Sequence, residues 1–588
     1  MTQTIGLAMI VRDEEQNLAA CLESVRGAVD EIVIVDTGSA DRTVEIAGRY
    51  TDKVYHYPWD DDFSAARNYA IAQTRSDWVL SLDADEELDT TSGDLRALVN
   101  NDSGYEAYFL PLYNRTAQFP GDYSRFLVLR LFRNSAAYRF HGRIHEQVGV
   151  GRQEAVGIAE GPAIWHRTLS GKERNRKRGR NLALLQRAAA ADPDSPFLQY
   201  YLGVEWLGLG KAERALPCLQ SACTRLTDAQ ILFRAPAVRF LVVCLKTLGR
   251  LDEAICVCLE ESLRYPAYAD LFFEGGVLFE QKGEYEIAIR WFEEAINCGP
   301  PPAIFSHTNG TGSFLSLYHL GYCHEKLHRL KEAKDYYEQA LASEPGYVYP
   351  LYNLFLLSLA ENGPQGAFDH LAAAGHLAQP ERAGALADLF FEAGYPDLAC
   401  ACIEKGVLAA GFPDDGAARR LVRFRVYAGR PAEALSLLND IRRVGGGLDS
   451  RLAVDEVVAL ILKQDYGAAK RKALSLWSQS DGRGAAWALL NLISLCRSGS
   501  RCGRPEESRE AAVIQATLAI MEDCLRYPPW SAGVDGRAYG SLVANAVRFL
   551  VRLSPRGCTA LAAYLQAKAG AVRQIMDYKY DRAGRVLR

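Results

Sequence analysis

The 588-residue sequence lacks several features that would assign a class of protein at once. No apolar run approaches the roughly 18 residues of a membrane-spanning helix, so we expect no membrane span. Residues 1–10 have no basic segment before their apolar stretch, unlike a secretory signal. None of the 14 cysteines forms a C-x-x-C pair, which argues against zinc and redox motifs. These absences predict a cytoplasmic protein with reduced, buried thiols.

The sequence also has no large excess of positive or negative residues. The net charge is −5, from 67 basic and 72 acidic residues, so composition gives no reason to expect nucleic-acid binding. The balance nevertheless conceals an asymmetry, because residues 1–170 contain 16 basic and 26 acidic residues. A basic run at residues 172–180 follows this acidic front. It is typical of a solvated helix face, or of a docking surface for the acidic front or an acidic acceptor.

The front of the chain alternates apolar strands with helical segments. Continuous apolar runs are typical of strands that are buried on both faces of a sheet. We expect such strands at residues 5–11, 31–35, 54–57 and 78–82, with helices at 13–27, 41–50 and 63–74. This alternation predicts a parallel sheet in a Rossmann-like α/β domain. Residues 126–132 and 144–150 are predicted as strands of a mixed or antiparallel edge.

A short motif recurs through the rest of the chain. It joins a turn residue to a small residue five positions later, with a period near 34 residues that is typical of the tetratricopeptide repeat. Strong copies lie at 210–215, 249–254, 283–288 and 328–333, and weaker ones at 362–367, 394–399, 429–434, 464–469 and 503–508. One spacing of 45 residues predicts an inserted loop at 299–312. Such arrays present a concave surface suited to polypeptides, although this one could instead only dimerise the protein or support the front domain.

These patterns divide the chain into four parts. We expect an α/β domain at residues 1–170, a basic helical linker at 171–194, strong repeats at 195–360, and divergent helical repeats with a C-terminal cap at 361–588. The fold class is therefore a Rossmann-like mixed sheet with helices on both faces, followed by an all-α solenoid.

Acidic residues follow two of the predicted strands. Asp36 comes after residues 31–35, and Asp83 and Asp85 come after residues 78–82. Ligands bind at the carboxyl ends of strands in open parallel sheets. Two carboxylates at such an edge must be solvated or bound to a cation, and oxygen ligands suit Mg²⁺ or Mn²⁺ together with substrate phosphates. The alternative is that one of these aspartates caps a helix.

Four motifs in order resemble glycosyltransferase family 2, the inverting enzymes of GT-A fold: IVRDEEQNL (10–18), VDTGSADRT (35–43), ARNYAI (66–71) and LDADEE (82–87). The resemblance implies a UDP-sugar donor and one divalent ion, Mn²⁺ or Mg²⁺. It places at the nucleotide-sugar the residues Val11, Arg12, Asp13, Glu14, Asp36, Gly38, Arg67, Asn68, Asp83 and Ala84. Asp13 departs from the Asn that the family usually has, and Arg67 could instead form an internal ion pair.

A second cluster, YRFHGRIHEQV (138–148) with IWH (164–166), is similar to a bacterial subgroup of the family. An inverting transfer needs a base to remove the acceptor proton, and Glu146 is the first candidate and His145 the second. The resemblance implies a metal shell of Asp85, His166 and Asp83. A structural role is the alternative for His166.

A family-2 domain joined to a repeat array resembles bacterial peptide and protein glycosyltransferases of the bacteriocin S- or O-glycosylating and flagellin types. That resemblance implies transfer of glucose or N-acetylglucosamine from a UDP-sugar to a Ser, Thr or Cys of a polypeptide held by the array. The alternatives are a saccharide or lipid-linked acceptor in cell-envelope glycan synthesis, and a non-catalytic scaffold with a vestigial transferase domain. The repeats could also form a homodimer.

Overall fold

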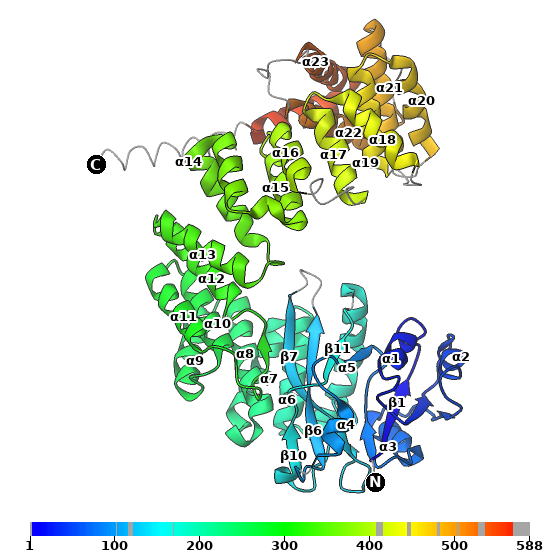
Figure 1. Cartoon of the computed structure of the whole chain (residues 1–588), viewed down its shortest axis with the longest axis vertical. Coiled ribbons are helices and arrows are strands. Elements are labelled where there is room, and N and C mark those ends of the chain that lie inside the picture. Colours follow the sequence, from blue (N-terminus) through cyan, green and yellow to red (C-terminus); the bar gives the residue numbers. More distant parts are fainter. Residues whose placement is uncertain are drawn as a thin grey trace. The chain divides into compact units, whose positions relative to one another are not determined.

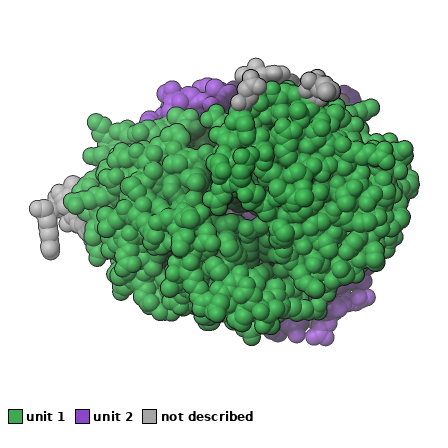
Figure 2. All heavy atoms as spheres, turned by 90° about the horizontal axis from the view of Figure 1, so that it is seen from below, with its two compact units in different colours: residues 1–350 green, residues 351–588 purple. Residues whose placement is uncertain are grey.

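The computed structural model describes residues 3–101, 103–115, 121–168, 170–406, 415–443, 449–478, 482–500, 503, 505–526 and 536–568. The chain divides into two compact units, Met1–Pro350 and Leu351–Arg588. Figure 2 colours them separately and shows that one face of the first unit is hollowed near its centre. The first unit contains the predicted α/β domain together with the strong repeats, so these parts form one body.

A mixed sheet organises the front of unit 1, in the strand order β3-β2-β1-β4-β7-β6-β11-β5 (Figure 1). The first four strands are parallel: β3 (Val54–His56), β2 (Glu31–Asp36), β1 (Ile5–Val11) and β4 (Trp78–Leu80). The others are β7 (Tyr123–Arg133), antiparallel to β4 and β6, then β6 (Ala107–Arg115), β11 (Ala163–His166), β5 (Glu86–Asp89) and β10 (Val156–Ile158). The predicted mixed α/β sheet is confirmed.

Helices cover both faces of this sheet. Alternate side chains of β1 point to opposite sides, so Leu7 and Met9 join α1 (Leu18–Ser24) and α4 (Leu95–Val99) in one core. Ala8 joins α3 (Phe63–Gln73) in the other. The short α2 is Thr43–Ala47. Strands buried on both faces explain why the runs at residues 5–11 and 31–35 are continuously apolar.

One predicted strand is wrong. In the predicted strand 144–150 only Gln147–Val148 (β9) is extended and paired, with Phe140–His141 (β8) in a separate two-stranded sheet. The turn between them has Gly142 and His145 at φ 97° and 49°, which ends any strand. Ile144 is buried against helices instead of within the sheet.

Antiparallel helix pairs form the rest of unit 1 (Figure 1). They follow α5 (Gly171–Ala191) as α6 (Pro196–Gly208), α7 (Ala212–Arg225), α8 (Ile231–Thr247), α9 (Leu251–Arg264), α10 (Ala269–Gln281), α11 (Tyr285–Asn297), α12 (Phe314–Lys326) and α13 (Leu330–Ser343). The first residue of each strong motif has positive φ, even His328 at 59°. The small residues that were predicted to allow close packing are fully buried: Ala215, Ala254, Ala288 and Ala333.

Unit 2 continues the same pattern of helices. Its elements are α14 (Tyr349–Ala373, two helices joined at Gly363), α15 (Pro380–Glu392), α16 (Pro396–Gly406), α17 (Asp415–Tyr427), α18 (Pro431–Arg443), α19 (Ser450–Leu462), α20 (Tyr466–Ser475), α21 (Arg483–Ser498), α22 (Glu510–Leu525) and α23 (Gly536–Leu553). The last weak motif differs from the others, because Ser508 is exposed in a 3₁₀ turn before α22. Over the described ranges, no helix combines the length and apolar character that a membrane crossing requires.

The predicted inserted loop joins the repeats to the sheet. Its residues His307–Thr308 (β12) pair antiparallel with Arg125 and Ser124 of β7. The fully buried Asp270 of α10 anchors the loop, since its carboxylate accepts from the Thr308 amide at 2.9 Å and the Thr311 hydroxyl at 3.0 Å. Arg239 Nε of α8 lies 3.3 Å from Asp270 Oδ1 and balances the charge.

Removing this anchor should loosen the joint. Asp270→Ala leaves Arg239 without its counter-charge and frees the loop, so we expect the free energy of unfolding of the full chain to fall by about 3 kcal/mol. Urea unfolding followed by circular dichroism measures it. Asp252→Ala, which removes an exposed partner of Lys282, is the matched control and should change little. Equal losses in the two variants would contradict the anchoring role.

Candidate active site

The loops after β1 and β2 form one edge of the site. Val11 pairs with Asp36 in the parallel register, so the residues that follow both strands meet. The Asp36 carboxylate accepts from the amides of Gly38 and Ser39, each at 3.1 Å, and is 3% exposed. Asp13 Oδ1 accepts from the Ala40 amide at 2.8 Å, which ties the two loops together. The exposed Arg12 lies beside Asp13. The predicted positions of this paragraph, which are Val11, Arg12, Asp13, Asp36 and Gly38, therefore lie along one edge of the site.

A buried ion cluster lies next to this edge. Arg67 of α3, only 8% exposed at its side chain, pairs with both Asp83 and Glu146. Arg130 of β7 pairs with Asp83 at 2.9 Å and with Glu86 at 2.7 Å. The internal ion pair that was the alternative for Arg67 is therefore present, and it joins two predicted site residues that lie 63 positions apart in the sequence.

This cluster separates the pKa values of its carboxyl groups. Burial alone would raise the pKa of Asp83, but Arg67 and Arg130 hold it well below its ordinary value. Burial raises the pKa of Glu86 to about 7, and the Asp83 charge adds to this against the opposing effect of Arg130. One carboxylate is thus kept ionised beside another that takes up a proton near neutral pH.

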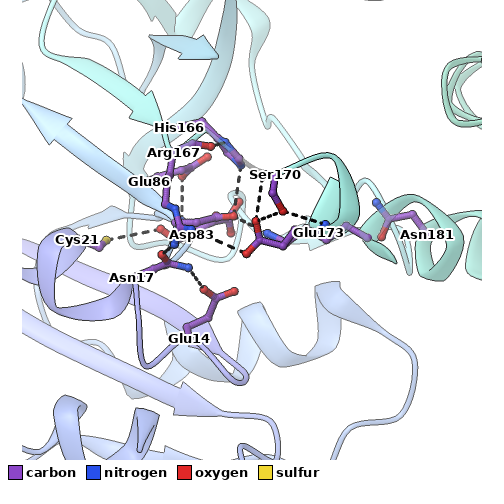
Figure 3. A network of polar contacts seen from close by, with 12 residues as sticks. Glu14, Asn17, Cys21, Asp83, Glu86, His166, Arg167, Ser170, Glu173 and Asn181 are labelled. Atoms are coloured by element: carbon purple, nitrogen blue, oxygen red, sulfur yellow. Dashed lines mark hydrogen bonds and ion pairs between the residues drawn. The ribbon is translucent and has the colours of Figure 1, made fainter. Parts of the chain in front are cut away.

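Asp85 faces a different set of groups. Its Oδ2 lies 3.4 Å from His166 Nε2 and is paired with the ammonium of Lys177 on α5. His166 Nδ1 donates to the Arg167 carbonyl at 2.8 Å, which directs Nε2 toward the carboxylate (Figure 3). Burial would lower the pKa of His166, but the nearby Asp85 carboxylate raises it. Burial would raise the pKa of Asp85, but His166 and Lys177 lower it to about 2.

An imidazole and a carboxylate that converge in this way fit a divalent cation such as Mn²⁺. The predicted set of three ligands is not preassembled, however, because Asp83 is bound by two guanidiniums. Over the described ranges, no group of three His, Cys, Asp or Glu side chains is arranged to hold a metal. The pair that could receive a cation is Asp85 and His166, with Lys177 now placed against it.

Glu14 and Ala84 lie close to this pair. Glu14 Oε2 accepts from Asn17 at 2.6 Å, and burial together with nearby Asp85 raises the pKa of Glu14 (Figure 3). Ala84 is buried between the two aspartates. Asn68 is occupied differently, because its amide both donates to and accepts from the backbone of Phe140, at 2.8 and 2.9 Å. Asn68 therefore holds the start of the loop at 142–146, and its predicted contact with the donor stays a prediction.

The two candidate bases lie on opposite sides of their loop. Glu146 is 10% exposed at its side chain and contacts Arg67 in the ion cluster. The His145 ring instead stacks on Tyr201 of α6, with centroids 3.8 Å apart and planes 1° from parallel. Burial lowers the pKa of His145 to about 4, so this imidazole is neutral at neutral pH. The geometry favours Glu146 as the group next to the other site carboxylates.

The sequence reasoning missed several site residues: Glu86, Arg130, Lys177, Tyr201 and Glu205. Lys177 had a signal, because the basic run was predicted either as a solvated face or as a docking surface. Lys177 of this run pairs with Asp85 of the front domain, which fits the docking alternative, and Arg187 beyond the run pairs with Asp61. Lys172, Arg174 and Arg176 are exposed, which fits the solvated face, so the run has both features. No local pattern marked Arg130 or Tyr201, since each becomes relevant only through distant contacts.

Two family models match separate parts of the chain. Residues 7–124 match the family model Glycosyl transferase family 2. Residues 314–347, which contain α12 and α13, match the Tetratricopeptide repeat model. The chain therefore has a glycosyltransferase family 2 domain near its N-terminus and tetratricopeptide repeats beyond it, and the resemblance seen in the motifs is confirmed.

Several curated relatives match parts of the chain. A TPR repeat-containing protein of Synechococcus elongatus is 46% identical over 145 residues, 24% of this chain and 35% of the relative. The SPbeta prophage-derived glycosyltransferase SunS of Bacillus subtilis is 27% identical over 227 residues, 38% of this chain and 53% of the relative. An uncharacterized glycosyltransferase of Rickettsia conorii is 36% identical over 88 residues, 15% of this chain and 31% of the relative.

The chain thus spans between about a third and a half of the length of these relatives. Among solved structures, the crystal structure of MamA is 20% identical and covers 30% of this chain and 96% of its own, with a TM-score of 0.25.

The pairing of Lys177 with Asp85 predicts competition with a metal. A cation must displace the ammonium before it can bind, so Lys177→Ala should bind Mn²⁺ about tenfold more tightly than the wild type. Isothermal titration of the full chain with Mn²⁺ alone measures this. Lys172→Ala, at an exposed position of the same helix, is the control and should match the wild type. Unchanged or weaker affinity in Lys177→Ala would contradict the competition.

Burial of neutral His145 predicts acid sensitivity. An unfolded imidazole binds a proton below about pH 6.5, whereas this one resists until about pH 4. Its contribution is therefore present above pH 6.5 and lost as the pH falls toward 4, by about 3 kcal/mol at most. The thermal midpoint of His145→Gln should fall less than that of the wild type between pH 7 and 4.5. His141→Gln, at an exposed site, should behave like the wild type, and a parallel decline in all three proteins would refute the prediction.

Proposed function

We propose that this chain, whose N-terminal part is a glycosyltransferase family 2 domain, is an inverting, metal-dependent hexosyltransferase. It would move glucose or N-acetylglucosamine from a UDP-sugar to a Ser, Thr or Cys of a polypeptide held by the repeats. The observation that supports this most is the convergence of the Arg67 ion cluster with the Asp85 and His166 pair at the carboxyl ends of the parallel strands of that domain.

In this proposal each element of the site has a separate task. The loops of Asp13 and Asp36 bind the nucleotide. Asp85 and His166 would hold the divalent ion, which would supply charge stabilisation for the diphosphate leaving group. Lys177, once the metal ion has displaced it from Asp85, would remain close enough to interact with the negative charge of the diphosphate.

Glu146 removes the acceptor proton. The oxygen or sulfur of the acceptor attacks the anomeric carbon and forms a bond to it, while the bond from that carbon to the diphosphate oxygen breaks. The proton of the acceptor hydroxyl or thiol passes to the Glu146 carboxylate. Arg67 holds that carboxylate in a fixed orientation through their ion pair. A single displacement of this kind inverts the configuration at the anomeric carbon.

A polypeptide acceptor is favoured by the way the repeats are attached. The array is joined to the sheet through β12 and to the loop of Glu146 through α6, both within unit 1. Repeats of this type present extended surfaces that bind polypeptides, so a bound segment would be held at a constant distance from the site. Transfer to a saccharide or lipid-linked acceptor is the second candidate, because the catalytic domain alone does not restrict the acceptor.

A vestigial transferase domain is less well supported. The predicted carboxylates are present, and Asp36, Asp83, Asp85 and Glu146 are each engaged in hydrogen bonds or ion pairs. Loss of function would be expected to remove some of them. The cytoplasmic location and a homodimer through the repeats stay predictions.

The decisive experiment follows sugar by mass. The full chain is co-expressed with the products of neighbouring genes, and intact-mass spectrometry looks for a hexose or N-acetylhexosamine shift. Asp85→Asn should lower transfer about 100-fold or more, because an electrostatic contribution to the leaving group is lost. Asp60→Asn, at an exposed acidic position of the same domain, should retain transfer.

Three results would count against the proposal. Transfer by Asp85→Asn at the wild-type rate would remove the basis for the metal site. If UDP-sugar with Mn²⁺ does not stabilise the wild type against heat, the proposed donor is wrong. Labelled sugar recovered in a lipid extract or a free oligosaccharide, and in no Ser, Thr or Cys of a digested protein, would favour the second candidate.

A further inference from the structure

We propose that Tyr201 and Glu205, on the first repeat helix α6, are positioning residues for the loop at 142–146 that carries Glu146. This inference rests on the proposed function only insofar as Glu146 acts as the base. It makes the beginning of the repeat array a part of the active site rather than a separate acceptor-binding module.

The loop packs directly on the helices of the array. Ile144 is buried in a cluster with Leu182 and Leu185 of α5 and Leu202 of α6. His145, the next residue, stacks face to face on Tyr201. Glu146 follows at once and turns the opposite way, to Arg67. Two consecutive side chains thus hold the loop to the array while the third contacts the ion cluster.

Glu205 lies next to the imidazole nitrogen of His145. His145 Nε2 lies 3.9 Å from Glu205 Oε1 and has no hydrogen-bond partner of its own. Glu205 is in turn held by Arg178 at 3.0 Å and by Asn181 at 3.2 Å, both on α5. A buried carboxylate with two such partners has one position, so it limits where the imidazole can move.

The loop has little to hold it otherwise. Its two-stranded sheet consists of two residue pairs, and His145 occupies a left-handed conformation that residues with a Cβ rarely adopt. Such a conformation persists only where the surroundings impose it. Asn68 and the hydrogen bond from the Phe63 amide to the Arg143 carbonyl hold the first half of the loop. In the second half, Ile144 is packed against α5 and α6 and Glu146 is paired with Arg67. The stacking on Tyr201 fixes His145 between them.

The charge of Glu146 is also felt at Tyr201. Burial raises the pKa of Tyr201, and the nearby charge of Glu146 raises it further. The ring contacts His145 by stacking, and it acts on Glu146 through this neighbouring residue. A change of this ring should alter the direction of the Glu146 carboxylate.

One consequence concerns how the two parts of the chain can be separated. A truncation near residue 195 would remove α6, and with it the support for Glu146. We therefore expect such a truncation to lose donor hydrolysis as well as transfer to a polypeptide. It cannot serve to distinguish a polypeptide acceptor from a saccharide acceptor.

Three variants of the full chain test the inference. Tyr201→Ala removes the ring that supports the loop, and Tyr201→Phe retains it. Tyr200→Ala is the matched control, because Tyr200 packs on Phe233 and Phe240 of α8 and on the Tyr201 ring, but has no ring contact with His145 among the described residues. Each variant is measured for donor affinity, for kcat and KM with the donor, and for hydrogen exchange of the amides at 142–148.

We expect Tyr201→Ala to lower kcat by at least about tenfold, because a displaced base loses its alignment, while KM for the donor stays within about threefold. Its amides at 142–148 should exchange faster. Tyr201→Phe should recover both properties, and Tyr200→Ala should lose stability of the array without faster exchange in the loop.

Two outcomes would overturn the inference. One is unchanged exchange at 142–148 in Tyr201→Ala. The other is an equal loss of kcat in Tyr200→Ala and Tyr201→Ala, which would indicate a general loss of stability. If the wild type turns over no UDP-sugar, the proposed function fails, whereas the exchange measurement still decides whether Tyr201 supports the loop.

Discussion

The structure of the site depends on the buried guanidinium of Arg67. An unpaired charge at 8% exposure would be costly, so the fold must bring carboxylates to it, and those are Asp83 and Glu146. One comes from the turn after β4 and the other from the turn between β8 and β9. Because both must meet one planar cation, their separation and orientation follow from its geometry. Arg130 extends the same arrangement to Glu86, across the antiparallel strand β7.

The repeats are joined to this centre at two places. The insertion between α11 and α12 adds a short strand to the catalytic sheet, and Asp270 anchors it from within the array. The helices α5 and α6 contact the site itself, through Lys177 on Asp85 and Tyr201 on His145. An acceptor held by the array would therefore be held by elements that also shape the site.

Local patterns predicted much of this fold. The strands at residues 5–11 and 31–35 were correct almost to the residue, because strands buried on both faces leave an uninterrupted apolar run. The repeats were visible because each needs a turn residue with positive φ and a small residue at its closest packing point. The prediction failed at 144–150, where Ile144 and Val148 are an even number of positions apart, as are residues on one face of a strand. The buried Ile144 faces α5 and α6 there, a contact that no local pattern encodes.

The sequence by itself determined the α/β domain, the period of the repeats and the candidate residues of the site, since motif order and spacing depend on residues that are close along the chain. Only the tertiary structure decided which charged and aromatic side chains contact one another. It assigned Asp83 to two arginines, Asp85 to His166 and Lys177, and the two neighbours His145 and Glu146 to opposite sides of one loop. The physical reason is that ion pairing and stacking act over a few ångströms in space between residues that are tens of positions apart in sequence, so only the folded chain defines them.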